Sequence, residues 1–278
     1  MNVRIIARLT FREASRRWVL WVALLLGIVF LVVYGIGYHE IYKDMVRQSV
    51  RMGPTAKNEM QNFFLLAGLY AVNFLTIMMT VLTSVDTLSG EIASGTVQTI
   101  VSKPMRRWEI VIGKWLGFAT MLTFYLLLMA GGVMLIVYLR SGYLAPRAVV
   151  GLGLMLVNIY LLLSVSLFGG AILSTLANGV LVFGLYSIAF IGGWIEQFGG
   201  FFKNQTAINI GIICSLIIPS EAVWRRAAFE MQSPLMGLLG FSPFSSTSVP
   251  SPLMIGYAIL YAILMMALAV RQFSKRDL

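Results

Sequence analysis

Residues 148–195, AVVGLGLMLVNIYLLLSVSLFGGAILSTLANGVLVFGLYSIAFIGGWI, decide the fold, because they run for 48 residues without Asp, Glu, Lys or Arg. As one α-helix this stretch would be about 70 Å long, more than twice the thickness of the hydrocarbon core of a bilayer. It must therefore fold back. Residues 174–179, STLANG, are the only run of turn-forming residues near its middle. We expect two membrane spans, at 148–173 and 180–195.

Four further uncharged stretches are long enough to cross a bilayer, which takes about 20 apolar residues. They are residues 18–38, 62–85, 115–139 and 253–270. The sequence therefore predicts an all-α membrane protein with six spans in a single transmembrane domain, residues 1–278. Residues 207–218 are apolar but too short to cross, so we expect a re-entrant or interfacial helix there, inside an outer region at 196–252.

The composition excludes several classes of protein. Of the 278 residues, 59% are hydrophobic and 12% are charged, and a soluble domain carries about twice that charged fraction. Cys214 is the only cysteine and His39 the only histidine, so we expect neither an internal disulfide nor a multi-histidine metal site. The chain has no G-x-x-x-x-G-K-[ST] stretch that could cradle a nucleotide phosphate. We expect no catalytic residue, metal or cofactor in this chain.

The net charge of +10 could suggest a nucleic-acid partner. In a membrane protein the positive charge is better explained by the excess of Lys and Arg in cytoplasmic segments. We therefore expect no nucleic-acid partner. If both termini are cytoplasmic, the inner segments hold 12 Lys/Arg in 60 residues and the outer ones 9 in 88. The bias favours a cell-membrane protein with both termini in the cytoplasm, although Arg225 and Arg226 fall on the outer side.

The N-terminal 17 residues form a basic segment before the first span. Arg4, Arg8, Arg12 and Arg16 are spaced four apart and would form one stripe on a helix. Ile5, Ile6, Leu9 and Phe11 fill much of the remaining surface. This pattern is typical of a helix that lies on anionic lipid headgroups.

The loop between the second and third spans, residues 86–114, differs from the other loops. Its pattern predicts a short helix between Gly95 and Pro104, with Val97, Ile100 and Val101 on one apolar face. Pro104 suits the first turn of a new helix that would run on into the third span. Such a short helix, held between two long helices, could transmit a movement of a soluble partner to the membrane spans. The alternative is a solvated connector whose basic residues only obey the positive-inside rule.

The loop resembles that of the ABC-2 type of ABC exporter permeases. The resemblance rests on Glu91, Gly95-Thr96, Pro104, Arg107 and Gly113-Lys114, spaced E-x3-G-T-x7-P-x2-R-x5-G-K. Residues 11–18, FREASRRW, are similar to the interfacial elbow helix of that family, and six spans with both ends inside also match it. The resemblance implies that two such chains, identical or related, form the substrate pathway, and that separate ATPase subunits hold ATP and Mg.

The resemblance also implies that the loop is a coupling helix that seats in the ATPase. The contact residues would be Glu91, Gly95, Thr96, Val97, Ile100, Pro104 and Arg107. We expect Glu91 at the aqueous surface. Residues 199–218 would correspond to the outer gate of the family.

Polar residues in the second span recur at helical spacing. Asn73, Thr76, Thr80 and Thr83 would line one face, either as contacts between helices or as the substrate path. Two other functions stay open: a membrane anchor or assembly factor, and a secondary carrier. Carriers coupled to protons usually keep a charged residue in the membrane, and the six predicted spans have none. The sequence does not indicate the substrate.

Overall fold

A computed structural model describes residues 2–48, 54–93, 106–233 and 249–275, and these residues form ten helices. The helices are α1 (Asn2–Arg16), α2 (Trp18–Gln48), α3 (Pro54–Ser84), α4 (Asp86–Ala93), α6 (Arg107–Ser141), α7 (Ala148–Ile172), α8 (Thr175–Phe201), α9 (Gln205–Ile217), α10 (Ser220–Met231) and α11 (Pro252–Lys275). By length and apolarity, α2, α3 continued by α4, α6, α7, α8 and α11 could each cross a membrane. The prediction of an all-α protein with six candidate spans is therefore confirmed.

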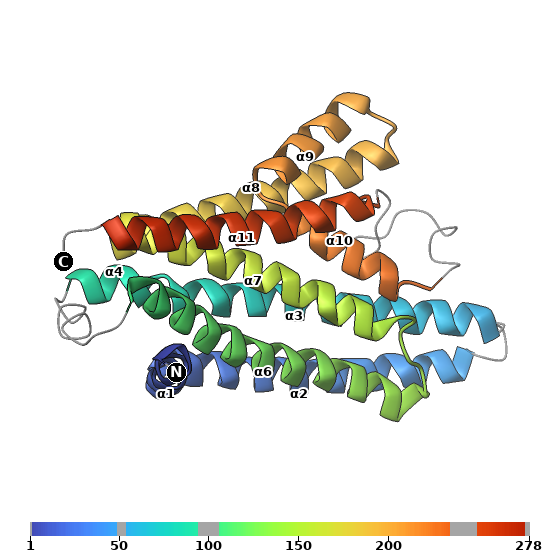
Figure 1. Ribbon diagram of the computed structural model, residues 1–278. Coiled ribbons are helices and arrows are strands. Elements are labelled where there is room, and N and C mark those ends of the chain that lie inside the picture. The colour runs from blue at the N-terminus through green and yellow to red at the C-terminus, as the bar shows by residue number, and fades with distance from the viewer. Residues whose placement is uncertain (1, 49–53, 94–105, 234–248, 276–278) are drawn as a thin grey trace.

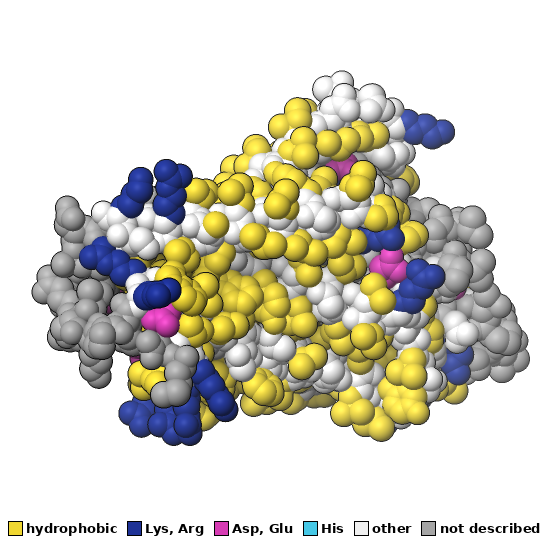
Figure 2. Space-filling model, viewed as in Figure 1, with side chains coloured by type: hydrophobic (Ala, Val, Ile, Leu, Met, Phe, Trp, Pro, Cys, Tyr) yellow, Lys and Arg dark blue, Asp and Glu magenta, His cyan; other side chains and the backbone are white. Residues whose placement is uncertain are grey.

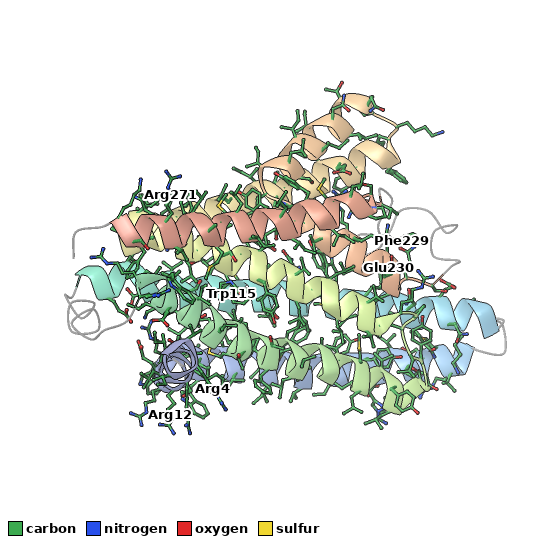
Figure 3. All side chains as sticks on the ribbon, viewed as in Figure 1. Arg4, Arg12, Trp115, Phe229, Glu230 and Arg271 are labelled. Carbon is green, nitrogen blue, oxygen red and sulfur yellow. The ribbon has the colours of Figure 1, made fainter. Side chains whose placement is uncertain are left out.

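The long helices lie roughly alongside one another in a bundle (Figure 1). At one end of the bundle, which we call the termini end, lie α1, α4 and the C-terminal end of α11; α1 is seen end-on there, so it crosses the direction of the long helices. On the face shown in Figure 2, apolar side chains dominate the middle, and Lys and Arg gather toward the ends. Arg4, Arg12 and Arg271 lie toward the termini end, and Phe229 and Glu230 toward the opposite end (Figure 3).

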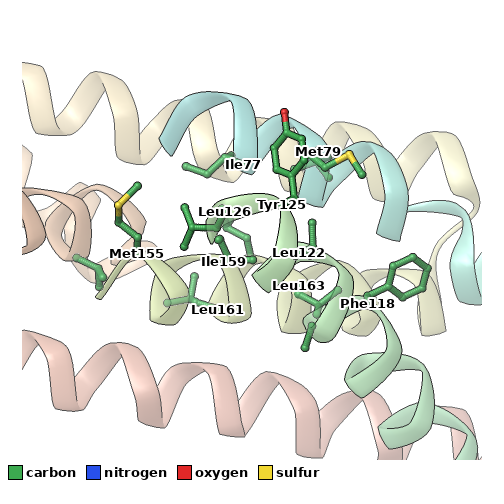
Figure 4. Packing of buried hydrophobic residues seen from close by; sticks show 14 of the residues in the cluster. Ile77, Met79, Phe118, Leu122, Tyr125, Leu126, Met155, Ile159, Leu161 and Leu163 are labelled. Carbon is green, nitrogen blue, oxygen red and sulfur yellow. The ribbon is translucent and has the colours of Figure 1, made fainter. Parts of the chain in front are cut away.

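The core lies where α3, α6 and α7 pack together. Figure 4 shows buried side chains from these three helices in contact, among them Ile77, Leu126 and Ile159. Helix α7 is central, since it packs against α3, α6, α8, α10 and α11. Helices α2 and α11 leave few of their side chains buried, as expected where a helix faces lipid or another chain.

The fold-back inside residues 148–195 is confirmed, but it is shorter than predicted. Helix α7 ends at Ile172 and α8 begins at Thr175, so only Leu173 and Ser174 link them. Both link residues have extended backbone conformation, which is enough to reverse the chain. Asn178 and the rest of the predicted turn lie in the first turns of α8.

The helix of the fifth span is longer than the predicted span, and its extension carries one charged residue. The uncharged stretch predicts a short span at 180–195, with an extension toward Gly199 as the alternative, and α8 continues to Phe201 and includes Glu196. Glu196 is buried, and Arg225 of α10 pairs with it, which compensates the cost of the buried carboxylate. One argument against a secondary carrier, the absence of charge in the spans, is therefore weakened.

The outer region contains two further helices. Helix α9 packs along α8 as an antiparallel hairpin that leans away from the bundle (Figure 1). Helices α9 and α10 meet at an angle of 107°, which fits a broken span or a re-entrant loop rather than two simple crossings. The predicted apolar segment 207–218 corresponds to α9. Asn204 starts that helix, because its side-chain oxygen accepts hydrogen bonds from the backbone N–H groups of Thr206 and Ala207.

Candidate functional site: the termini end and the polar interior

Helix α4 is held against the start of α6 by an ion pair. A break at Val85 separates α3 from α4, and Glu91 of α4 accepts a hydrogen bond from Nζ of Lys114 in α6. The Lys114 side chain is 4% exposed and the Glu91 side chain 16%. The expectation that Glu91 lies at the aqueous surface is therefore wrong, because its carboxylate is turned inward to the ammonium group of Lys114.

A group of buried polar contacts joins α3 and α4 to the fold-back between α7 and α8. Ser84 Oγ donates to Ser166 Oγ at 2.7 Å. Asn178 Nδ2 donates to the carbonyl oxygens of Val85 and Ser166, both at 3.0 Å. Ser89 Oγ and Thr175 Oγ1 lie 2.9 Å apart in a further hydrogen bond. Asn178 of α8 binds the Val85 carbonyl at the break and the Ser166 carbonyl of α7. A movement of α4 would therefore displace α7 and α8 through these hydrogen bonds.

Two arginines tie other elements to this end of the bundle. Arg17, between α1 and α2, lies 3.6 Å from the Asp86 carboxylate at the start of α4. Arg107 Nη1 donates to the Ser274 carbonyl oxygen near the end of α11 at 3.1 Å. The structure therefore places Arg107 at a contact within the chain. The two candidates that can be placed, Glu91 and Arg107, both lie at the termini end.

The remaining members of the predicted ATPase contact lie outside the described residues. These are Gly95, Thr96, Val97, Ile100 and Pro104. The short helix predicted between Gly95 and Pro104 therefore stays a prediction.

The four polar residues of the second span do lie in the interior of the bundle. Asn73, Thr76, Thr80 and Thr83 are all at most 3% exposed. Each threonine hydroxyl donates to a carbonyl oxygen of its own helix at 2.7 Å, four residues earlier. Asn73 alone of the four has a described side-chain bond to another helix, since its Oδ1 accepts from Asn158 Nδ2 at 3.3 Å. Among the described residues the threonine hydroxyls therefore do not join α3 to its neighbours.

Asn158 links this stripe to the outer region. Its Oδ1 accepts a hydrogen bond of 2.7 Å from Ser220 Oγ at the start of α10. Ser220 is fully buried, and α10 has Pro219 rather than Ser220 in its capping position. Hydrogen bonds between three buried polar side chains therefore link α3 to α10 through α7.

A buried charge contact between α8 and α10 is one that the sequence did not reveal. Arg225 Nη1 lies 2.7 Å from Glu196 Oε1, and Nη2 donates to Glu196 Oε2 at 2.7 Å. The two side chains are 2% and 5% exposed, and Glu221 is buried one turn before Arg225 on α10. A buried ion pair that includes a charge-assisted hydrogen bond fixes the relative position of α8 and α10. It could not be read from the sequence because 29 residues separate the partners.

The second outer arginine is also paired. Arg226 Nη2 donates to Glu230 Oε1 at 2.6 Å, and Arg147 Nη1, from the link between α6 and α7, donates to Glu230 Oε2 at 2.9 Å. Arg225 and Arg226, the weakest point of the predicted orientation, are therefore each bound to a carboxylate.

Comparison with known proteins adds one finding. Residues 4–278 match the family described as ABC-2 family transporter protein. No curated protein matches the chain in a sequence search.

Proposed function

The chain belongs to the ABC-2 transporter family, and from this premise we propose that it is the permease subunit of an ATP-driven ABC exporter. It would form the substrate pathway with a second copy or a related chain, as one transmembrane domain over residues 1–278. Separate ABC ATPase subunits would bind ATP and Mg, and this membrane subunit would do no chemistry of its own.

The observation that carries the proposal is the way α4 is clamped. The helix follows directly on α3 and is bound to α6 through Glu91 and Lys114, and its first turn contacts the start of α8. A push on the segment that follows α4 would therefore reach three candidate spans at once. Coupling between two sites requires an element of this kind, whose position both sites can bias.

Glu91, together with the segment that contains Gly95, Thr96, Val97, Ile100 and Pro104, would act at the boundary with the ATPase. Glu91 would position the segment through Lys114 rather than bind the ATPase from an exposed position. Arg107 would hold the start of α6 against α11. Asn73, Thr76, Thr80 and Thr83 are proposed to border the pathway, since they form a buried polar stripe along one face of α3.

ATP hydrolysis by the purified complex tests this function against an anchor, an assembly factor or a secondary carrier. We expect the co-purified complex to hydrolyse ATP and the chain alone neither to bind nor to hydrolyse it, because it has no phosphate-cradling loop. We further expect vesicles containing the complex to move substrate only when ATP is supplied. Saturable ATP binding by the pure chain, or transport driven by an ion gradient without ATP, would contradict the proposal.

The proposal places both termini in the cytoplasm, and single cysteines can test this. In a Cys214→Ser background, Glu13→Cys on α1 should react with an impermeant thiol reagent only after the cells are permeabilised. Lys203→Cys, in the exposed link between α8 and α9, is the matched control and should react in intact cells. Labelling of position 13 in intact cells would show that the orientation is inverted.

A further inference from the structure

Helix α1 is seated on α6 by close contact with two glycines. A Cβ atom added at Gly113 would lie 2.6 Å from Ile6 Cβ, and one added at Gly117 would lie 2.7 Å from Thr10 Cβ. Ile6, Thr10 and Ala14 are buried along this seam. The opposite face of α1 keeps Ile5 and Leu9 more than half exposed, beside the arginine stripe. The helix is therefore fixed in place, and its free face is both apolar and basic.

Two grooves meet beside this seat. The first has a volume of about 560 Å³ and is lined by Arg4, Arg8, Phe11, Gly117, Thr120 and Phe124, among others. The second, of about 310 Å³, lies between α1, α2, α3 and α6. Phe11 and Phe124 line both grooves, so the two grooves adjoin each other at these side chains.

The two grooves differ in chemistry along their length. The guanidinium groups of Arg4 and Arg8 line the first groove. No hydrogen bond or ion pair joins either of them to another described residue. The residues that line the second are uncharged and mostly apolar, and include Trp21, Leu24, Met121 and Leu128. Along α6 the lining advances from Gly117 to Leu128, away from the termini end and toward the middle of the bundle.

We propose that these two adjoining grooves together bind one anionic glycerophospholipid. Its phosphate lies between Arg4 and Arg8, and an acyl chain passes Phe11 and Phe124 into the groove between α2 and α6. Guanidinium groups bind phosphate oxygens with charge-assisted hydrogen bonds, and a crossing helix at the end of a membrane bundle lies at headgroup depth. The apolar length beyond the arginines matches a lipid and does not match a small soluble phosphate.

The arginine stripe itself supplies a matched control. Arg12 and Arg16 are exposed on the same helix but line neither groove. Arg4 and Arg12 point in different directions from α1 in Figure 3. General attraction of the stripe to an anionic surface would use all four arginines, whereas the proposed site uses only Arg4 and Arg8.

Native mass spectrometry of the detergent-purified full chain tests the site with added phosphatidylglycerol and phosphatidylcholine. We expect one retained phosphatidylglycerol on the wild type and preference over phosphatidylcholine. The Arg4→Gln, Arg8→Gln variant should retain it at least about tenfold less, since two charge-assisted hydrogen bonds are lost. The Arg12→Gln, Arg16→Gln variant, which loses the same charge, should stay within about twofold of the wild type.

A second variant tests whether lipid binding depends on the shape of the groove as well as on the charge of the arginines. Thr120→Trp keeps every arginine and fills the space beside Phe124, so it should also lose the bound lipid. Soluble glycerol phosphate should not compete with the lipid. Equal loss in both arginine pairs, no preference for the anionic lipid, full retention by Thr120→Trp, or competition by glycerol phosphate would each overturn the proposal.

Discussion

Replacing Arg225 with methionine is expected to destabilise the folded protein by roughly 3–5 kcal/mol, the usual cost of breaking a buried ion pair. The loss arises because the carboxylate of Glu196 would stay buried without the guanidinium group that now binds both of its oxygens. The measurement is the free energy of unfolding in detergent or lipid, or the melting temperature of the purified chain. We also expect export to fall, since α8 and α10 would no longer be fixed to each other.

Two variants make this prediction specific. Arg140→Met removes an exposed arginine from the end of α6 and should change the stability by no more than about 1 kcal/mol. Adding Glu196→Leu to Arg225→Met should recover part of the lost stability, because it removes the carboxylate that would otherwise stay buried without a partner. An Arg225→Met protein as stable as the wild type, or a double variant no better than the single one, would show that the pair does not hold the outer region together.

Lys114→Met is expected to reduce substrate export per ATP hydrolysed by roughly fivefold or more, the lower range of coupling energies between distant sites. Without Lys114, α4 would lose its charge contact with α6, and Glu91 would turn toward water. The stability should also fall, but by less than in Arg225→Met, because Glu91 already keeps 16% of its side chain exposed. The measurement is transport and hydrolysis in the same vesicles.

The control for this prediction is Lys275→Met, which removes an exposed lysine from the same end of the bundle. It should leave the amount of substrate exported per ATP hydrolysed unchanged. The exchanged pair Glu91→Lys, Lys114→Glu should restore much of the coupling, since the ion pair can form in the reverse sense. Normal coupling in Lys114→Met, or no recovery in the exchanged pair, would make α4 a passive connector.

The spans could be predicted because the bilayer imposes a length on every crossing helix. The uncharged stretches gave the number of spans and the fold-back near Ser174, but not where the helices end. Helix α2 continues to Gln48 and α8 to Phe201, since polar residues do not stop a helix once it leaves the hydrocarbon or finds a partner. The predicted end at residue 195 is too early for this reason, because the charge of Glu196 marks a boundary in the sequence, whereas its pairing with Arg225 makes it part of the interior.

The polar interior was only partly predictable. The spacing of Asn73, Thr76, Thr80 and Thr83 correctly placed them on one buried face. It could not show that the threonine hydroxyls would bond their own helix, because helical geometry offers them that carbonyl whatever packs outside. Glu91 was singled out by its motif, but its partner Lys114 lies 23 residues away, and only the packing of α4 on α6 brings the two together.

The close seat of α1 on Gly113 and Gly117 has a mechanical consequence. With Ile6 and Thr10 pressed against backbone, α1 has no room to slide along α6, so a tilt of α6 must carry α1 up or down through the headgroup layer. Each cycle that moves α6 would then do work against the surrounding lipid. If the proposed transport cycle moves α6, the thickness and lateral pressure of the membrane would oppose that movement, and stiffer bilayers would slow it.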